Sequence, residues 1–436
     1  METKAIDYGT RREIISWSMF DFANSSYTTV VTTSIFNAYF VKTICQGLDL
    51  ATATFYLALA NGLANGLVVL TAPVIGAIAD RRGLKKRFLF IATLICVAAT
   101  IGLSFMHQGM VVASIGCLEI AGFAFGTSED IIAAFLPEIA PRHKMGRISA
   151  FGWTLGYVGG LIVLAACLAY VSWAQSVGQT ASQFVPVTML IVAGVFMCGA
   201  TPTFLFLRER KSGEMAATAP HPVSIIELVK ASREHKDLFT FFIALLLYSC
   251  GSTTVVMLAA VYSEQVMQFK TSETIGLVMA VNVAGALGAM FFGYLQDAFG
   301  SVRTMAETLV LWVVSILLAI CAGPQDRALF WTAAALMGLS MGSSASAGRA
   351  LVGMLAPQGR SAEFFGLWGL VVKASAIIGP LTYSAATFLS HSNYRVSLVS
   401  TVIFFISGLI MCLQVNEKRG RAHAAPLLDL QAHYEA

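Results

Sequence analysis

Long apolar runs dominate the chain, and short segments rich in charge, glycine and proline separate them. A membrane-spanning helix needs about 20 mostly apolar residues, whereas a strand of a membrane barrel needs only about ten. The runs are continuous and far longer than a barrel strand, so they predict transmembrane α-helices. Twelve spans are expected, near residues 14–41, 53–79, 88–106, 110–135, 147–171, 184–207, 238–264, 272–298, 304–322, 327–353, 362–389 and 394–415.

The composition agrees with this pattern. Of the 436 residues, 57% are hydrophobic and 12% are charged, against roughly 45–50% and about 25% in soluble domains. These values exclude a soluble enzyme, a disordered chain and a nucleic-acid binder as descriptions of the whole chain. The sequence has no P-loop motif, and all seven histidines fall in loops or tails. We therefore expect no ATPase, no catalytic residues, no metal site and no cofactor.

The distribution of cations orients the spans. Of the 28 Lys and Arg residues, 23 lie in the N-terminal tail, in or at the edge of the even-to-odd loops, and in the C-terminal tail. The opposite loops hold Lys42, Lys270, Arg327 and Arg395, and Lys373 lies inside a span. Because positive loops remain on the cytoplasmic side, both termini are expected to be cytoplasmic. The short loops and the lack of a targeting segment favour a bacterial inner membrane over an organelle.

The longest loop divides the chain. It covers residues 208–237, and Ser224 and Glu227 have the spacing of a capping box at the start of an amphipathic helix. We expect four parts: an N-terminal six-helix bundle over 1–207, a cytoplasmic linker over 208–237, a C-terminal six-helix bundle over 238–415 and a cytoplasmic tail over 416–436.

The two halves repeat one another. The pattern Gly-x-x-x-Asp-x-x-Gly occurs after span two and again 217 residues later after span eight, at Gly76, Asp80 and Gly83 and at Gly293, Asp297 and Gly300. Arg303 keeps the offset of Lys86. Duplicated halves are used by secondary transporters that bind their substrate near the bilayer midplane. The predicted fold class is therefore an all-α membrane protein with twelve transmembrane helices in two pseudo-symmetric six-helix bundles.

Several motifs resemble known families. The segment from Gly76 to Lys86 resembles the signature between spans two and three of the major facilitator superfamily. The segment from Trp17 to Tyr27, Leu136-Pro137-Glu138 and the glycine-rich run from Gly152 to Gly160 are similar to the vacuole-effluxer-like family, which includes autophagy-related vacuolar amino-acid exporters and many bacterial relatives. The resemblance implies the major facilitator fold, transport by alternating access, and a central cavity lined by spans one, four, seven and ten.

Polar residues inside the first and fourth spans are candidates for a substrate or proton pathway. A charge at the centre of a membrane helix costs about 2.5–3.5 kcal/mol, so it needs a partner, water or a function. In span one, Asp21, Ser25, Thr28 and Thr32 form a polar stripe suited to a wet cavity, with Asn24 to one side. The candidates there are Asp21, Asn24, Tyr27 and Thr28. In span four, Glu119 and Asp130 are 11 residues apart, on one face and about 16 Å apart along the helix axis. For Asp130 and the adjacent Glu129, a role at the membrane interface stays open beside the functional one.

The second half adds one buried cation and several hydroxyl groups. Lys373 lies about 11 residues, or roughly 16 Å, into span eleven, which makes snorkelling to the membrane edge difficult. It is expected to pair with a substrate carboxylate, or with Asp21 or Glu119 in the empty protein. Tyr248 in span seven and Ser343 in span ten are the corresponding polar candidates.

The repeated loop motif suggests a gate. Asp80 is placed to cap a neighbouring helix N-terminus, where the helix dipole favours an anion, and Arg81 and Lys85 to bind acidic partners. Asp297 and Arg303 have the same roles in the second half, and Gly76, Gly83 and Gly300 complete the two gating motifs. Such contacts bias alternating access if they form only when the inner side is closed.

Together these features predict a secondary active transporter of a small polar solute, an amino acid or a similar molecule, coupled to protons. Its expected partners are the solute, protons and membrane lipids, with no nucleic acid, and we expect a monomer. One alternative with the same fold is an exporter of drugs, siderophores or other metabolites. Another is a non-transporting sensor or scaffold, although the buried charges argue against it.

Overall fold

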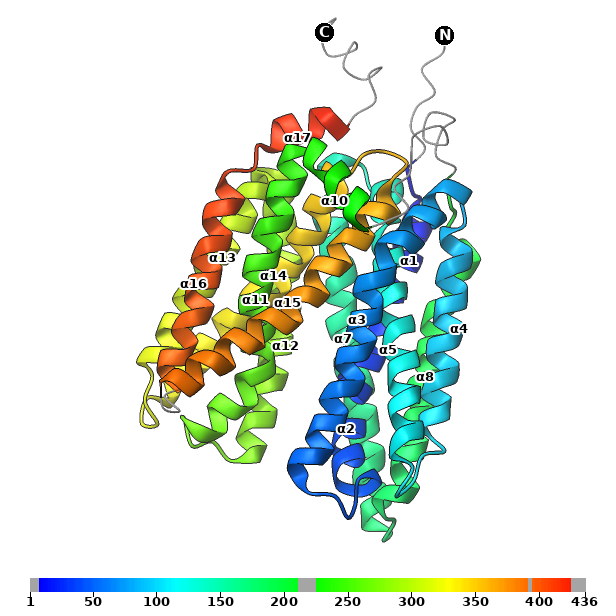
Figure 1. Ribbon diagram of the computed structural model, residues 1–436, viewed down its shortest axis with the longest axis vertical. Helices are drawn as coiled ribbons and strands as arrows, with labels where there is room; N and C mark the ends of the chain where they lie inside the picture. Colours follow the sequence, from blue (N-terminus) through cyan, green and yellow to red (C-terminus); the bar gives the residue numbers. More distant parts are fainter. Residues whose placement is uncertain (1–7, 211–224, 391–393, 425–436) are drawn as a thin grey trace, which may run out of the picture.

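The computed structural model describes residues 8–210, 225–390 and 394–424, and every regular element within these ranges is helical. The helices of the first half are α1 (Arg11–Tyr27), α2 (Ile35–Tyr39), α3 (Leu50–Arg82), α4 (Lys85–Leu103), α5 (Val111–Ala133), α6 (Leu136–Ile139), α7 (Met145–Ser176) and α8 (Ala181–Phe206). Those of the second half are α10 (Ile225–Glu234), α11 (Lys236–Gln265), α12 (Thr271–Phe299), α13 (Ser301–Cys321), α14 (Arg327–Leu355), α15 (Ser361–Leu389), α16 (Tyr394–Leu413) and α17 (Glu417–Ala424). Figure 1 shows the two halves side by side.

Eleven helices of the described residues have the length and hydropathy of membrane spans. The first predicted span, 14–41, differs because it is not one continuous α-helix. After α1 the chain forms a π-helical turn over Thr28–Thr32, then α2, then a second π-helical turn over Phe40–Ile44. The hydroxyl groups of Thr33 and Ser34 both donate to the carbonyl of Thr29, at 2.8 and 2.5 Å. Side chains that bond the backbone in this way compete with the regular helical ladder, which explains the break.

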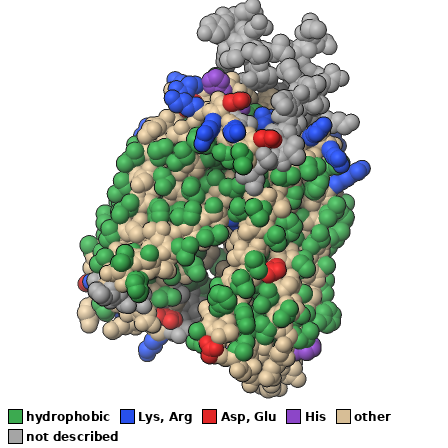
Figure 2. All heavy atoms as spheres, in the orientation of Figure 1, with side chains coloured by type: hydrophobic (Ala, Val, Ile, Leu, Met, Phe, Trp, Pro, Cys, Tyr) green, Lys and Arg blue, Asp and Glu red, His purple; other side chains and the backbone are tan. Residues whose placement is uncertain are grey.

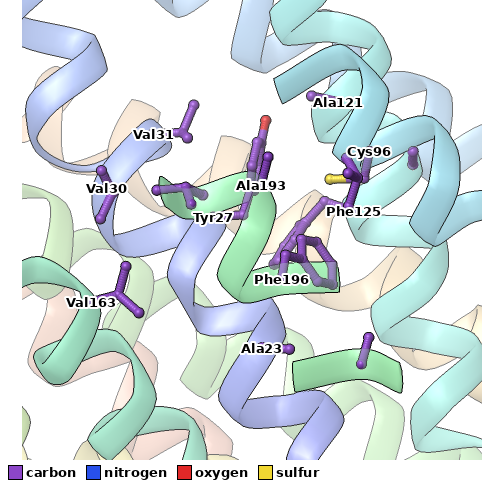
Figure 3. Close-up of a cluster of buried hydrophobic side chains, with 14 of the residues drawn as sticks. Ala23, Tyr27, Val30, Val31, Cys96, Ala121, Phe125, Val163, Ala193 and Phe196 are labelled. Carbon is purple, nitrogen blue, oxygen red and sulfur yellow. The ribbon is translucent and has the colours of Figure 1, made fainter. Parts of the chain in front are cut away.

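Each half has its own apolar core. In the first half, α1 packs against α7 and α8, and α4 packs against α5 and α8. Tyr27 of α1 stacks on Phe125 of α5 with ring centroids 5.2 Å apart, and Figure 3 shows this pair with Cys96 and Phe196. In the second half, Trp312 of α13 stacks on Phe405 of α16 at 4.8 Å. The predicted bundle architecture is confirmed.

The halves meet mainly along two helix pairs, α3 with α15 and α7 with α12, and α14 also contacts α7 while α15 contacts α5. Glycines of the repeated motif permit this close approach. A methyl group at Gly76 of α3 would overlap the carbonyl of Ala362 in α15, and one at Gly293 of α12 would overlap Ala150 in α7. Small residues let helix backbones approach in this manner within a membrane.

One end of the molecule carries the start of α1 together with α10 and α17 (Figure 1), and we call it the termini end. In Figure 2, Lys and Arg side chains gather at this end, hydrophobic side chains cover the flanks below it, and a hollow lies between the halves toward the opposite end. The linker helix α10 is present, with Ile226 exposed and Leu228 buried. Ser224 of its predicted capping box lies outside the described residues.

Candidate functional site

A buried ion pair joins the halves near the termini end. Arg349 of α14 donates from Nη1 to Oδ2 of Asp21 in α1 at 2.8 Å. Its Nε donates to Oγ of Ser149 in α7 at 3.1 Å, and its Nη2 donates to the carbonyl of Ser149 at 2.8 Å. The Arg349 side chain is only 4% exposed and that of Asp21 is 13% exposed. The guanidinium group therefore ties α14 to two helices of the other half at once.

Aromatic rings and a glycine shape the space around this pair. The Arg349 guanidinium lies 4.6 Å from the ring centroid of Trp17 and 5.5 Å from that of Trp153. Such cation–π contacts gain strength when the cation is removed from water. A methyl group at Gly152 would overlap the Asp21 carboxylate and would lie 2.7 Å from Nη2 of Arg349. Gly152 is thus required by the close fit of the pair.

A second ion pair crosses between the halves on α5 and α15. Lys373 of α15 donates from Nζ to Oε2 of Glu129 in α5 at 3.1 Å, and the two side chains are 15% and 27% exposed. The adjacent Asp130 is buried, and neither of its carboxylate oxygens accepts a hydrogen bond from a described residue. Asp130 packs directly against the backbone of Gly369 in α15, where a methyl group would overlap its carboxylate. Of the three acids in the site, Asp21 and Glu129 each have a cation as a hydrogen-bonded partner, whereas Asp130 does not.

The positive and negative charges of the site come from different halves of the protein. Both cations, Arg349 and Lys373, come from the second half, whereas the three acids, Asp21, Glu129 and Asp130, come from the first. Glu129 interacts electrostatically with Asp21, and Lys373 with Asp130, so the five groups form one connected set. Attraction across the interface favours a structure in which the halves are together at this level. Any movement that parts them must separate these charges.

The repeated motif builds a second layer of contacts at the termini end. Asp80, at the end of α3, accepts at Oδ2 a hydrogen bond of 2.9 Å from the backbone N–H of Glu363, in the first turn of α15. Its Oδ1 lies 3.3 Å from Nζ of Lys85, which also pairs with Glu138 and donates to Oγ of Ser361 at 3.3 Å. Asp80 therefore caps a helix of the opposite half, as the sequence predicts.

The second copy of the motif repeats this arrangement. Asp297, near the end of α12, accepts from the backbone N–H groups of Gly146 and Arg147 at 2.9 and 3.2 Å, in the first turn of α7. The Nε atom of Arg147 adds a contact of 2.8 Å to the same carboxylate. Gly83 and Gly300, which end α3 and α12, have φ values of +60° and +97°. Glycine adopts such values without the strain that other residues incur.

The comparisons with known proteins agree with this geometry. Residues 39–425 match the family model described as "Vacuole effluxer Atg22 like". The chain belongs to this family. The Atg22-like chain is 24% identical over 412 residues to an uncharacterized MFS-type transporter of Bacillus subtilis (strain 168), covering 92% of this chain and 94% of that protein. It is 27% identical over 308 residues to autophagy-related protein 22-1 of Aspergillus fumigatus, covering 64% of this chain but only 50% of that relative.

Solved structures place the Atg22-like chain in the major facilitator fold. A fucose:proton symporter of E. coli superposes with a TM-score of 0.73 at 10% identity, covering 93% of this chain and 98% of that chain. A bacterial homologue of the iron transporter ferroportin, described in an outward-facing state, gives 0.70 at 14% identity and covers 93% and 99%. The family and the fold are those of integral, multi-pass transporters and not of enzymes.

The structure separates the predicted pathway residues of this Atg22-like transporter. Glu119 is partly exposed and has no hydrogen bond or ion pair with a described residue. The hydroxyl group of Thr28 donates to the carbonyl of Ser25 in the preceding turn, and the Oγ of Ser343 donates to the carbonyl of Ser340. Asn24, Tyr27 and Tyr248 are buried, and the Tyr248 ring packs near Gly348 of α14.

One expectation about the polar groups needs correction. Lys373 was expected to pair with Asp21 or Glu119 in the empty protein, but it pairs with Glu129. In the α1 stripe, Ser25 lies against Gly156 of α7, and Asp21, Ser25 and Thr28 each keep part of their surface exposed. The pairing of Lys373 differs because sequence spacing gives the face of one helix and not the neighbour that covers it.

The two copies of the gating motif differ in the contacts that their cations make. Lys85 takes the cationic role in the first half, whereas Arg81 is exposed and forms no ion pair with a described residue. Arg303 bonds to Glu307 of its own helix at 3.0 Å and forms no ion pair with the described residues of the first half. Arg349 and Glu138 are the principal members that were not among the predicted site residues, and Glu129 was considered only beside Asp130. The signal for Arg349 was its place near the inner end of the predicted span ten.

Proposed function

We propose that this chain is a proton-coupled carrier that moves a small polar solute by alternating access. Amino acids are the first solutes to test, because the resemblance to the vacuole-effluxer-like family implies them. We place it in a bacterial cytoplasmic membrane with both termini in the cytoplasm. The gathering of cations at the termini end supports this orientation, and the near full-length match to a Bacillus subtilis relative supports the membrane.

The partition of charges between the halves carries the proposal. With the termini end closed, three acids of the first half face two cations of the second. Removing one partner of a buried ion pair costs about 3–5 kcal/mol, so parting the halves without compensation is costly. A proton on one of the acids reduces the charge that must be separated. Proton binding and opening of the termini end are therefore linked.

Asp130 is the acid best suited to take this proton. It is buried and lacks a hydrogen-bond donor among the described residues, while Glu129 holds Lys373 directly. Burial without a hydrogen-bond donor disfavours the charged form of a carboxylate. Lys373 and Glu129 are both partly exposed, so a polar solute entering between the halves is able to meet a cation and an anion.

Transport in proteoliposomes tests this function. Counterflow with a panel of labelled amino acids identifies the solute, and uptake is then compared with and without an imposed pH gradient. We expect gradient-driven accumulation in the natural protein and its loss in Asp130→Asn, with counterflow retained. Glu119→Gln is the matched control, since Glu119 lies outside the charged set. If Asp130→Asn and the natural protein accumulate solute equally under the gradient, the proton-coupling proposal is wrong.

A further inference from the structure

A cavity of about 650 Å³ opens at the termini end, outside the transport site. Its walls come from the loop before α7, from the end of α12 and from the segment that leads into α17, so both halves contribute to it. Cavities of roughly 300–1,000 Å³ are typical of small-molecule sites. The charged lining residues are Arg142, Lys418, Arg421, Asp297 and Glu417, and His143 adds a titratable ring.

Both acidic side chains that line the cavity already accept hydrogen bonds from other groups of the protein. The oxygens of Asp297 accept from the backbone of α7 and from Arg147. Glu417 accepts at Oε2 from the backbone N–H groups of Ser301 and Val302, at 2.8 and 3.1 Å, and its Oε1 accepts from Arg421. Each carboxylate therefore neutralises a helix N-terminus, and the remaining charge that faces the cavity is positive.

Two of the basic side chains, Lys418 and Arg421, keep a donor group without a partner among the described residues. Lys418 is exposed and forms no ion pair with a described residue. Nε of Arg421 is buried and has no hydrogen-bond partner among the described residues. Arg142 donates from Nη1 to the backbone carbonyl of Arg421 at 3.0 Å, which brings a guanidinium of the first half beside α17 of the second.

We infer that this cavity, lined by Arg142, Lys418 and Arg421, is a regulatory binding site for a phosphate-bearing anion, either free or as a lipid headgroup. Arginine and lysine bind phosphate oxygens through charge-assisted hydrogen bonds. Because Arg142 belongs to one half and the other two cations to the other, the bound anion bridges the halves. It binds best when the termini end is closed and so stabilises that state. The inference is independent of the transported solute.

Thermal unfolding of the purified full-length chain tests the site. We titrate sodium pyrophosphate against sodium chloride of equal ionic strength and follow tryptophan fluorescence. At about 100 times its Kd, pyrophosphate is expected to raise the Tm by several degrees over the chloride reference. Lys418→Ala and Arg142→Ala should each weaken the apparent affinity about tenfold, whereas Arg303→Ala, at the same end but outside this cavity, should not.

Two results would overturn the site: a Tm that pyrophosphate moves no more than chloride does, or an equal response in both cavity variants and the natural chain. Nanodiscs separate the two sources of phosphate. Stabilisation by phosphatidylglycerol over phosphatidylcholine, lost in Lys418→Ala and Arg142→Ala, assigns a lipid headgroup. Stabilisation by pyrophosphate alone assigns a free anion. None of these readouts requires transport, so they stand or fail separately from the proposed function.

Discussion

Replacing Arg349 by alanine removes the most heavily bonded cation between the halves. The side chain is 4% exposed and makes three hydrogen bonds, one to Asp21 and two to Ser149. Its loss leaves Asp21 buried without its cation, and breaking a buried pair in this way costs about 3–5 kcal/mol. The cost falls only on the state in which the termini end is closed. A change of about 3 kcal/mol shifts the ratio of closed to open molecules by roughly 150-fold.

Spin labels at Lys144 of the first half and Arg303 of the second measure this shift. Both residues are exposed at the termini end, and their separation increases when that end opens. In double electron–electron resonance, Arg349→Ala should move the distance distribution toward longer values. Arg327→Ala, which removes an exposed ion pair with Glu273 inside the second half, is the control and should leave it unchanged. Identical distance distributions for Arg349→Ala and the natural protein would refute the conclusion that the Arg349–Asp21 pair stabilises the closed termini end.

Three further substitutions follow from the same contacts. Gly152→Ala places a methyl group on the Asp21 carboxylate and should lower the initial uptake rate at least tenfold, whereas Gly62→Ala, with open space around it, should leave the rate unchanged. Gly76→Ala drives α3 away from α15 at a cost of about 1–3 kcal/mol, which spin-label distances at the termini end would report as opening. Asp130→Asn should make counterflow independent of pH between mildly acidic and neutral conditions; a persisting acid dependence would place the titrating group elsewhere.

The repeat and the span pattern made much of this structure predictable. The loop motif at Asp80 and its copy at Asp297 both cap a helix of the opposite half, because capping follows from local geometry and the helix dipole. Helix positions follow from apolar runs that must bury their backbone groups in a membrane. The two-bundle fold and the capping contacts of these aspartates were therefore predictable from the sequence.

The ion-pair partners of the buried cations could not be predicted from the sequence. Lys373 pairs with Glu129 on α5, and Arg349 with Asp21 on α1, because the assembled halves bring these side chains within reach of each other. Crossing points depend on the packing of all helices in both halves, which a single sequence does not display. The break after Tyr27 was missed for another reason: hydroxyl groups near Thr29 bond to the backbone inside an otherwise apolar run.

The most direct test of the central claim is to measure proton movement and solute movement together. Liposomes that contain the chain and a trapped pH-sensitive dye receive an amino acid identified by counterflow. The partition of charges between the halves predicts a proton flux that starts with solute addition, scales with solute flux and disappears in Asp130→Asn. Solute movement without any proton flux in the natural protein would contradict it.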